Sequence, residues 1–227
     1  MSADLAQLDQ DRALILAGIS HDLRTPLTRL RMGIEMAGDD GLREGMSADV
    51  EEMDKTIGQF LDFARSESGE ALQEVDVGAL LAELATQYQR RGFNVAVPPA
   101  PTLASAIPVR PQALRRAVSN LIDNALRHAG NDSPVELALN AAAGESSIEV
   151  RDRGPGIPSQ EVERMKRPFA RLETARTDAA GAGLGLAIVE RIARSHNGRL
   201  ELLAREGGGL VARLVLHPST PTATLAP

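Results

Sequence analysis

Apolar residues in the N-terminal part of the chain recur at the spacing of a helix. Between about Leu5 and Ala37 they stand three and four positions apart, interrupted only at Pro26, in a stripe of Leu16, Ile19, Leu23, Leu27, Leu30 and Ile34. A second stripe follows, made of Val50, Met53, Ile57, Phe60, Leu61 and Ala64. Asp39-Asp40-Gly41 predicts a break between the two helices, and Ser47 is expected to cap the second. The pattern predicts a helical hairpin.

Two amphipathic helices alone bury too little apolar surface to be stable. Pairing of two hairpins into a four-helix bundle would cover both stripes, so we expect residues 1–66 to form a homodimer. Residues 67–74 lose the apolar period and are rich in small and polar side chains, which predicts a linker.

Residues 75–217 combine helical and strand patterns and are expected to form a second domain. Helices are predicted over 76–90, 111–128 and 183–195, with a short helix capped by Ser159. Strands are predicted near 93–97 and Ile107, and as two hairpins over 135–152 and 199–216. These elements predict an α/β sandwich in which helices cover one face of a mostly antiparallel sheet. Residues 218–227, rich in Thr and Pro, are expected to be a disordered tail.

Composition narrows the classes of function. The net charge of −6 and the 2% of aromatic residues argue against nucleic-acid binding as the main task. The absence of cysteine excludes disulfides and thiolate metal sites. No apolar run approaches the roughly 20 residues of a membrane span, and Met1 to Arg12 lacks the apolar core of a signal peptide. We therefore expect a soluble chain without membrane contact of its own.

His21 is the first candidate for chemistry. His21 and Thr25 point about 160° away from the centre of the first apolar stripe, so both face outward. A neutral imidazole is a usable nucleophile, and Asp22 could orient the ring or take its proton. A His-Asp pair by itself is more often an ion pair on a helix surface than a catalytic pair.

Asn120 and Asn124 stand four residues apart in the helix predicted over 111–128, and Arg116 and Arg127 fall on the same side. Amide oxygens beside guanidinium groups suit Mg²⁺ bound to phosphates, because this ion takes oxygen ligands and bridges substrate phosphates. A solvated helix face is the alternative interpretation.

Two glycine-rich segments add candidate ligand loops. Asp152-Arg153-Gly154-Pro155-Gly156 follows a predicted strand, where the carboxylate could accept a hydrogen bond from an exocyclic amine. A strand-ending turn is the alternative there. Gly181-Ala182-Gly183-Leu184-Gly185-Leu186 opens a helix whose N–H groups and positive dipole end would suit an anion.

These motifs, in this order, resemble the transmitter region of bacterial two-component sensor histidine kinases over about residues 5–216. Residues 20–27 look like the H box of that family, and 120–124 like the N box. Residues 152–156, 168–171 and 181–186 look like the G1, F and G2 boxes. The H box, together with Ala175-Arg176-Thr177, is most similar to the osmosensor EnvZ type.

The resemblance implies an ATP-binding domain of the Hsp90-like type that phosphorylates a histidine on a dimeric helical bundle. His21 would be the phosphoacceptor and Asp22 the base that takes its proton. Thr25 would hold a water for the reverse, phosphatase reaction. Asn124 would be the main Mg²⁺ ligand, with Asn120 assisting.

The same resemblance implies the residues of the ATP site. Asp152 would bond the adenine amine, Arg127 and His128 would line the phosphate and ribose, and Arg171 would reach the γ-phosphate. The nucleotide loops would be shaped by Gly154, Gly156, Gly181, Gly183, Gly185 and Leu186. Arg153 adds a positive charge and Ala182 removes a hydroxyl relative to the usual family pattern, so both bear on nucleotide affinity.

The implied function is ATP-dependent autophosphorylation of His21 and phosphoryl transfer to an aspartate of a response regulator. We expect the chain to be cytoplasmic, as part of a membrane-anchored bacterial sensor in the inner membrane. Two alternatives stay open at this point: a mechanical ATPase of the Hsp90-like group, and a degenerate nucleotide-binding scaffold that only docks partners.

Overall fold

The computed structural model describes the chain in two compact units. One comprises residues 1–66 with 173–184, and the other residues 67–172 with 185–217 and the C-terminal residues. The described residues are 27–28, 30, 32–35, 40–64, 70–97, 106–129, 133–142, 145–170 and 183–217.

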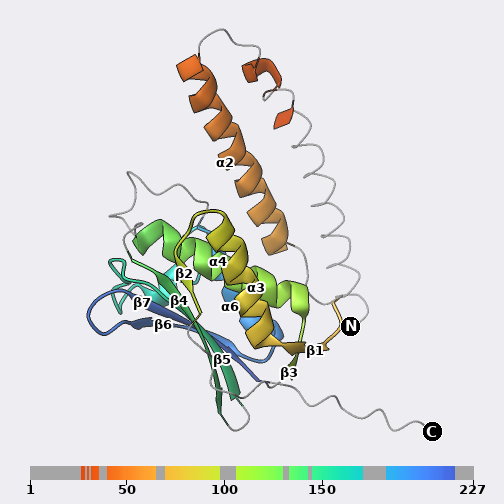
Figure 1. Cartoon of the computed structure of the whole chain (residues 1–227), viewed down its shortest axis with the longest axis vertical. Coiled ribbons are helices and arrows are strands. Elements are labelled where there is room, and N and C mark those ends of the chain that lie inside the picture. The colour runs from red at the N-terminus through yellow and green to blue at the C-terminus, as the bar shows by residue number, and fades with distance from the viewer. Residues whose placement is uncertain are drawn as a thin grey trace, which may run out of the picture. The chain divides into compact units, whose positions relative to one another are not determined.

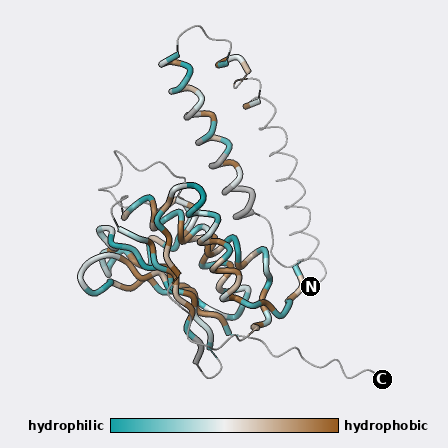
Figure 2. Tube along the Cα trace, in the orientation of Figure 1, coloured by the Kyte–Doolittle hydropathy of each residue, from teal (hydrophilic) through white to brown (hydrophobic). Residues whose placement is uncertain are grey.

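The first unit contains α2, Asp40–Ala64, and a preceding helical segment within residues 27–35 (Figure 1). Leu27 and Ile34 of that segment are buried together with Val50 of α2, and Ile57 packs against them. The two predicted stripes therefore do meet. Apolar and hydrophilic residues alternate along α2 (Figure 2), and no helix among the described residues is long and apolar enough to cross a bilayer.

The predicted N-terminus of the second helix is wrong. The helix begins at Asp40, so Gly41 and Ser47 lie inside it rather than in a break and at a cap. Asp40 occupies the first turn, where a carboxylate favours the helix dipole, and it pairs with Arg43 at 2.7 Å. These local gains offset the cost of about 1 kcal/mol for a glycine inside a helix.

One hairpin covers only part of its apolar surface. Leu42, Met46 and Met53 of α2 are exposed, as is Leu30 of the preceding segment. The three α2 residues lie within an arc of about 40° beside the arc of Val50 and Ile57. The apolar face of α2 is thus wider than its contact with the first helix.

The second unit is built on a five-stranded sheet with the order β2-β4-β5-β7-β6. Its strands are β2 (Val95–Ala96), β4 (Val135–Ala142), β5 (Glu145–Arg151), β6 (Arg199–Ala204) and β7 (Leu210–Leu216). The β2–β4 pair is parallel and the other three pairs are antiparallel. A separate two-stranded sheet pairs β1 (Gln73–Asp76) with β3 (Ala106–Val109).

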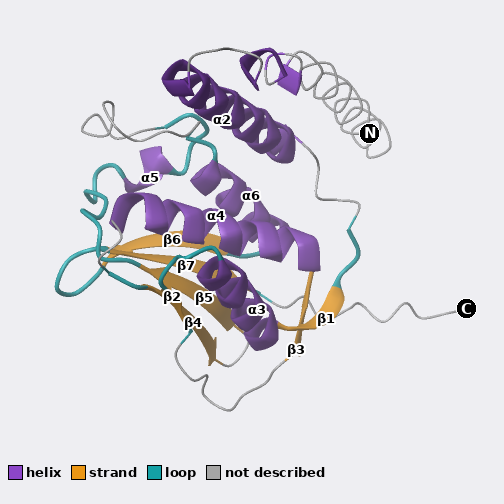
Figure 3. Ribbon diagram, turned by 45° about the horizontal axis from the view of Figure 1, so that its top comes forward, coloured by secondary structure: helices purple, strands orange, loops and turns teal. Residues whose placement is uncertain are grey.

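Three helices cover one face of the larger sheet (Figure 3). They are α3 (Val77–Arg90), α4 (Pro111–Ala129) and α6 (Gly185–Ser195). The layer between helices and sheet contains fully buried side chains such as Leu81, Leu114, Leu121, Ile148, Ile188 and Leu214. This arrangement confirms the predicted α/β sandwich.

Local boundaries differ from the predictions at three places. The strand expected over 93–97 is reduced to two residues. The short helix α5, Val162–Met165, has Glu161 rather than Ser159 at its N-cap, because residues 159–161 form a turn in which Glu161 N–H bonds the Pro158 carbonyl at 2.8 Å. Helix α6 begins at Gly185, since Gly183 has a φ of 68°, which a right-handed helix does not allow.

The buried carboxylate of Glu149 connects neighbouring strands of the sheet through hydrogen bonds to arginine side chains. Glu149 of β5 accepts hydrogen bonds from Arg151 and from Arg213 of β7, each at 2.8 Å, and Arg213 also reaches Glu201 of β6 at 3.1 Å. Burial by itself would raise the pKa of Glu149, but the bonds from both arginines outweigh it and lower the pKa below its ordinary value.

We expect Glu149→Gln to lower the free energy of unfolding by about 1–3 kcal/mol at neutral pH, because it removes the charge that two arginines share. The ionised Glu149 stabilises the fold above its ordinary pKa of 4.5, and this contribution is lost as the pH falls through the lowered folded-state pKa. Urea unfolding between pH 3 and 7 measures both effects. The control Glu145→Gln changes a half-exposed carboxylate on the same strand and should cost less than about 0.5 kcal/mol. Equal losses in the two variants would contradict the prediction.

Candidate functional site

Helix α4 brings the polar and glycine-rich motifs together. A Cβ added to Gly185, at the start of α6, would lie 3.4 Å from Asn120 Oδ1. At the C-terminal end of α4, a Cβ added to Gly154 would lie 2.7 Å from the carbonyl oxygen of His128. The Asp152 loop and the opening of α6 therefore both lie against α4, and at Gly154 the approach is too close for a side chain.

The N-terminus of α4 is capped from outside the helix. Pro111 suits the first helical position because its missing N–H would have no partner there. The Glu70 carboxylate accepts hydrogen bonds from the backbone N–H groups of Gln112 and Ala113 at 2.8 and 3.0 Å. Glu70 lies in the expected linker, so the described part of that segment is held on the second unit.

The two asparagines lie on the half-exposed side of α4. Asn120 donates from Nδ2 to the Arg116 carbonyl at 3.0 Å, which leaves its oxygen facing the start of α6. The Asn124 amide has no hydrogen bond within the described part of the chain. Both amide oxygens are thus available to a hard cation, and the donor set fits Mg²⁺, which needs few protein ligands when phosphates supply the rest.

A carboxylate between the asparagines is used structurally. Asp123 accepts a hydrogen bond from the Tyr88 hydroxyl of α3 at 2.7 Å. Burial and the adjacent Asp123 charge both raise the pKa of Tyr88, so its hydroxyl stays protonated as the donor. This bond was not predicted, because it joins residues 35 positions apart.

Asp152 is buried at the end of β5. Its Oδ1 accepts hydrogen bonds from the Gly154 N–H at 2.7 Å and the Leu210 N–H at 3.3 Å. No donor among the described residues bonds its Oδ2. One carboxylate oxygen therefore holds the loop, and the other is available to a ligand N–H.

Arg127 and His128 are both exposed at the C-terminal end of α4. Partial burial of the His128 ring and the nearby Arg127 charge lower the pKa of His128, while the Asp152 charge opposes them. The ring is therefore neutral at pH 7 and can donate one hydrogen bond and accept another.

Other predicted residues also have defined places. Gly156 has a φ of 71°, and Leu186 is buried. Arg153 donates to the carbonyls of Glu206 and Gly208 at 2.8 and 3.3 Å, so its guanidinium binds the turn between β6 and β7. His21, Asp22, Thr25, Arg171 and Gly181 lie outside the described residues, and their roles stay predictions.

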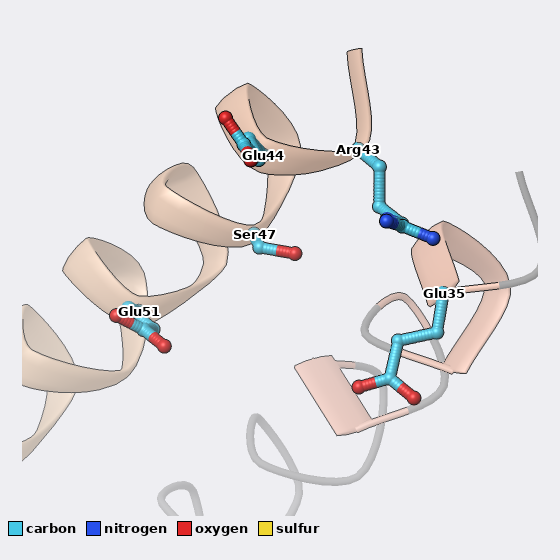
Figure 4. Close-up of a pocket in the computed structure, with 5 residues that line it drawn as sticks. All are labelled: Glu35, Arg43, Glu44, Ser47 and Glu51. Carbon is cyan, nitrogen blue, oxygen red and sulfur yellow. The ribbon is translucent and has the colours of Figure 1, made fainter. Parts of the chain in front are cut away.

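A cavity of about 510 Å³ lies in the first unit (Figure 4). It is lined by Glu35 of the first helical segment and by Arg43, Glu44, Ser47 and Glu51 of α2. Three carboxylates against one guanidinium make this cavity unsuitable for a polyphosphate. It contains none of the predicted site residues.

The comparison with protein families matches both units. Residues 109–220 match the family described as histidine kinase-, DNA gyrase B- and HSP90-like ATPase, and residues 11–69 match the His Kinase A (phospho-acceptor) domain. The chain belongs to the bacterial sensor histidine kinases.

Curated histidine kinases are similar over nearly the whole chain. The sensor histidine kinase GtrS of Pseudomonas aeruginosa is 35% identical over 91% of this chain and 42% of its own length. The signal transduction histidine-protein kinase/phosphatase MprB of Mycolicibacterium vanbaalenii is 32% identical over 96% of this chain and 48% of its own length. The chain thus spans about half the length of these relatives.

A solved histidine kinase has the same fold. The crystal structure of full-length ShkA in complex with AMPPNP superposes with a TM-score of 0.70 at 24% identity, over 92% of this chain and 47% of that chain. At this identity the likeness supports the fold alone.

Gly154→Ala should weaken ATP binding by about tenfold or more, because the added Cβ would collide with the His128 carbonyl and displace the Asp152 loop. Titration with a fluorescent ATP analogue would measure the dissociation constant. Gly45→Ala, in α2 with no atom within 4 Å of its Cβ, is the control and should leave binding unchanged. Wild-type affinity in Gly154→Ala would show that the close approach is not needed.

Proposed function

We propose that this chain binds ATP with Mg²⁺, phosphorylates His21 and passes the phosphoryl group to an aspartate of a response regulator. The observation that carries the proposal is the grouping of Asn120, Asn124 and Asp152 around α4, beside the opening of α6. Together these groups suit ATP. The carboxylate can bind the adenine base, the amide oxygens can bind a cation, and the helix N-terminus can bind phosphates.

Each described residue then has a role in binding. Asp152 Oδ2 accepts a hydrogen bond from the adenine amine, because Oδ1 is already used by Gly154 and Leu210. Asn124, with help from Asn120, would hold Mg²⁺, which would neutralise charge on the phosphates. Arg127 and His128 line the phosphate and ribose side, and Arg171 reaches the γ-phosphate.

The transfer step uses the neutral imidazole of His21. A ring nitrogen attacks the γ-phosphorus in line, the bond to the leaving ADP oxygen breaks, and Asp22 accepts the ring proton. The phosphohistidine then donates its phosphoryl group to the aspartate of the regulator. The match of residues 11–69 to the phosphoacceptor domain supports His21 in this role.

We propose a homodimer formed by residues 1–66, joined through residues 67–74 to a catalytic domain over 75–217, with Glu70 and the start of β1 tying the second half of that linker to the catalytic domain. The exposed Leu42, Met46 and Met53 of α2 support this assembly, since a second hairpin in a four-helix bundle would cover them.

The reverse activity is part of the proposal. Thr25 follows His21 by four residues, about one turn of the predicted helix, where it would position a water for attack on the phospho-aspartate. The kinase/phosphatase name of MprB supports a bifunctional enzyme. The finer likeness to the EnvZ type rests on the H box residues and stays a prediction.

We also propose that the chain acts in the cytoplasm as the transmitter part of a membrane-anchored bacterial sensor, because the relatives are named sensor kinases and extend beyond the matched region. The phosphoacceptor match favours a kinase over a mechanical ATPase. The half-exposed Asn124 and the buried Asp152 favour catalysis over a degenerate scaffold.

His21→Ala should abolish incorporation of phosphate from γ-labelled ATP with Mg²⁺. The wild-type protein should carry label that is lost in acid and kept in alkali, as expected for phosphohistidine. His217→Ala, which removes a half-exposed histidine at the end of β7, is the control and should be labelled like the wild type. Label retained in His21→Ala would refute the phosphoacceptor assignment.

Thr25→Ala should keep autophosphorylation and slow dephosphorylation of the phospho-regulator by about tenfold or more, because the hydroxyl that orients the water is lost. Release of inorganic phosphate from purified phospho-regulator provides the measurement. Thr25→Ser keeps the hydroxyl and should retain most of the activity. Unchanged phosphatase activity in Thr25→Ala would exclude this role for Thr25.

A further inference from the structure

The turn between β6 and β7, residues 205–209, lies directly against Asp152. The Leu210 N–H that follows the turn bonds Asp152 Oδ1 at 3.3 Å, and the Asp152 N–H bonds the Leu210 carbonyl at 3.0 Å. A Cβ on Gly209 would lie only 2.1 Å from the Asp152 carbonyl oxygen. The position of the Asp152 carboxylate therefore depends on where this turn sits.

Arg205 connects the turn to two other segments. Its side chain is only 11% exposed; Nη2 pairs with Glu136 Oε1 at 2.6 Å, and Nη1 donates to the Asp152 carbonyl at 3.2 Å. Glu136 lies on β4 in register with Arg151, the residue before Asp152. A planar guanidinium can hold both acceptors at once.

Arg153 connects the same two segments in the other direction, from the Asp152 loop to the turn. It donates from the Asp152 loop to the carbonyls of Glu206 and Gly208 in the turn. An arginine from each of the two segments thus donates hydrogen bonds to backbone carbonyls of the other segment.

We propose that Arg205 is a positioning residue for Asp152 and, through it, a determinant of selectivity for adenine. This inference rests on the proposed ATP-binding function. Without Arg205, the turn loses its tie to Glu136 and to the Asp152 carbonyl. The Leu210 N–H then no longer holds Oδ1 in place, and Oδ2 loses its alignment with the ligand amine.

Direct contact of Arg205 with the nucleotide does not fit the geometry. The side chain is nearly buried, and both of its terminal nitrogens are engaged by protein oxygens. Its effect should therefore reach the base through Asp152 and leave the phosphate contacts unchanged.

The test compares ATP with ITP, which carries an oxygen in place of the adenine amine. Competition against a fluorescent nucleotide gives both dissociation constants in the full chain. Arg205→Ala should weaken ATP binding about threefold to tenfold with little change for ITP, so that the preference for ATP falls. Arg205→Lys, which keeps the charge but not the two-acceptor geometry, should give an intermediate preference.

Arg199→Ala is the matched control. Arg199 stands at the other end of β6, where it pairs with Glu201 and Glu145, and its loss should leave the preference for ATP unchanged. If Arg205→Ala does not fold, Glu136→Gln, which removes the partner charge while Arg205 stays, should lower the preference in the same direction.

Each result decides between distinct conclusions. An unchanged ATP preference in a folded Arg205 or Glu136 variant overturns the positioning role and leaves the proposed function standing. Equal weakening of ATP and ITP also overturns it, because a merely structural role would affect both nucleotides alike. A wild-type chain that binds no ATP overturns the proposed function itself.

Discussion

The burial of one face of α4 is the constraint on which the proposed nucleotide site depends. Leu114, Leu121 and the small apolar residues between them pack into the layer between helices and sheet. This packing fixes the rotation of the helix, so that Asn120 and Asn124 must lie on the half-exposed side. A rotation by one residue, about 100°, would turn the asparagines away from the opening of α6 and cost the core contacts. The packing of the core and the geometry of the proposed ligand site therefore depend on the same orientation of α4.

Glycine and arginine residues have different roles in placing the Asp152 loop beside this helix. At Gly154 the missing side chain lets the Asp152 loop reach the His128 carbonyl, which places the carboxylate near the end of α4. Arg205 and Arg153 then hold the same loop to the neighbouring turn through backbone carbonyls. A buried carboxylate needs hydrogen-bond donors, and Asp152 Oδ1 obtains two of them from segments far apart in the sequence.

Long periodic elements were predicted well, and their ends were not. The α4 stripe and the two strand hairpins are local patterns, so each predicted its own element. The start of α2 was missed because Asp40 and Arg43 stabilise a turn that the glycine pattern disfavours. Among the candidate site residues, the asparagines and Asp152 were predicted from spacing and family likeness. Leu210 and Arg205 carried no signal, since their partners lie more than 50 positions away.

The sequence by itself determined the kind of site: the amphipathic α4 with two asparagines, the aspartate at a strand end and the glycines where backbone must pass closely. These follow from chemistry and spacing within single segments. Only the tertiary structure decided that Glu70 caps α4, that Arg153 bonds the turn between β6 and β7, and that Arg205 bonds the Asp152 carbonyl. Such contacts join distant segments, and they form only after the core has brought those segments together.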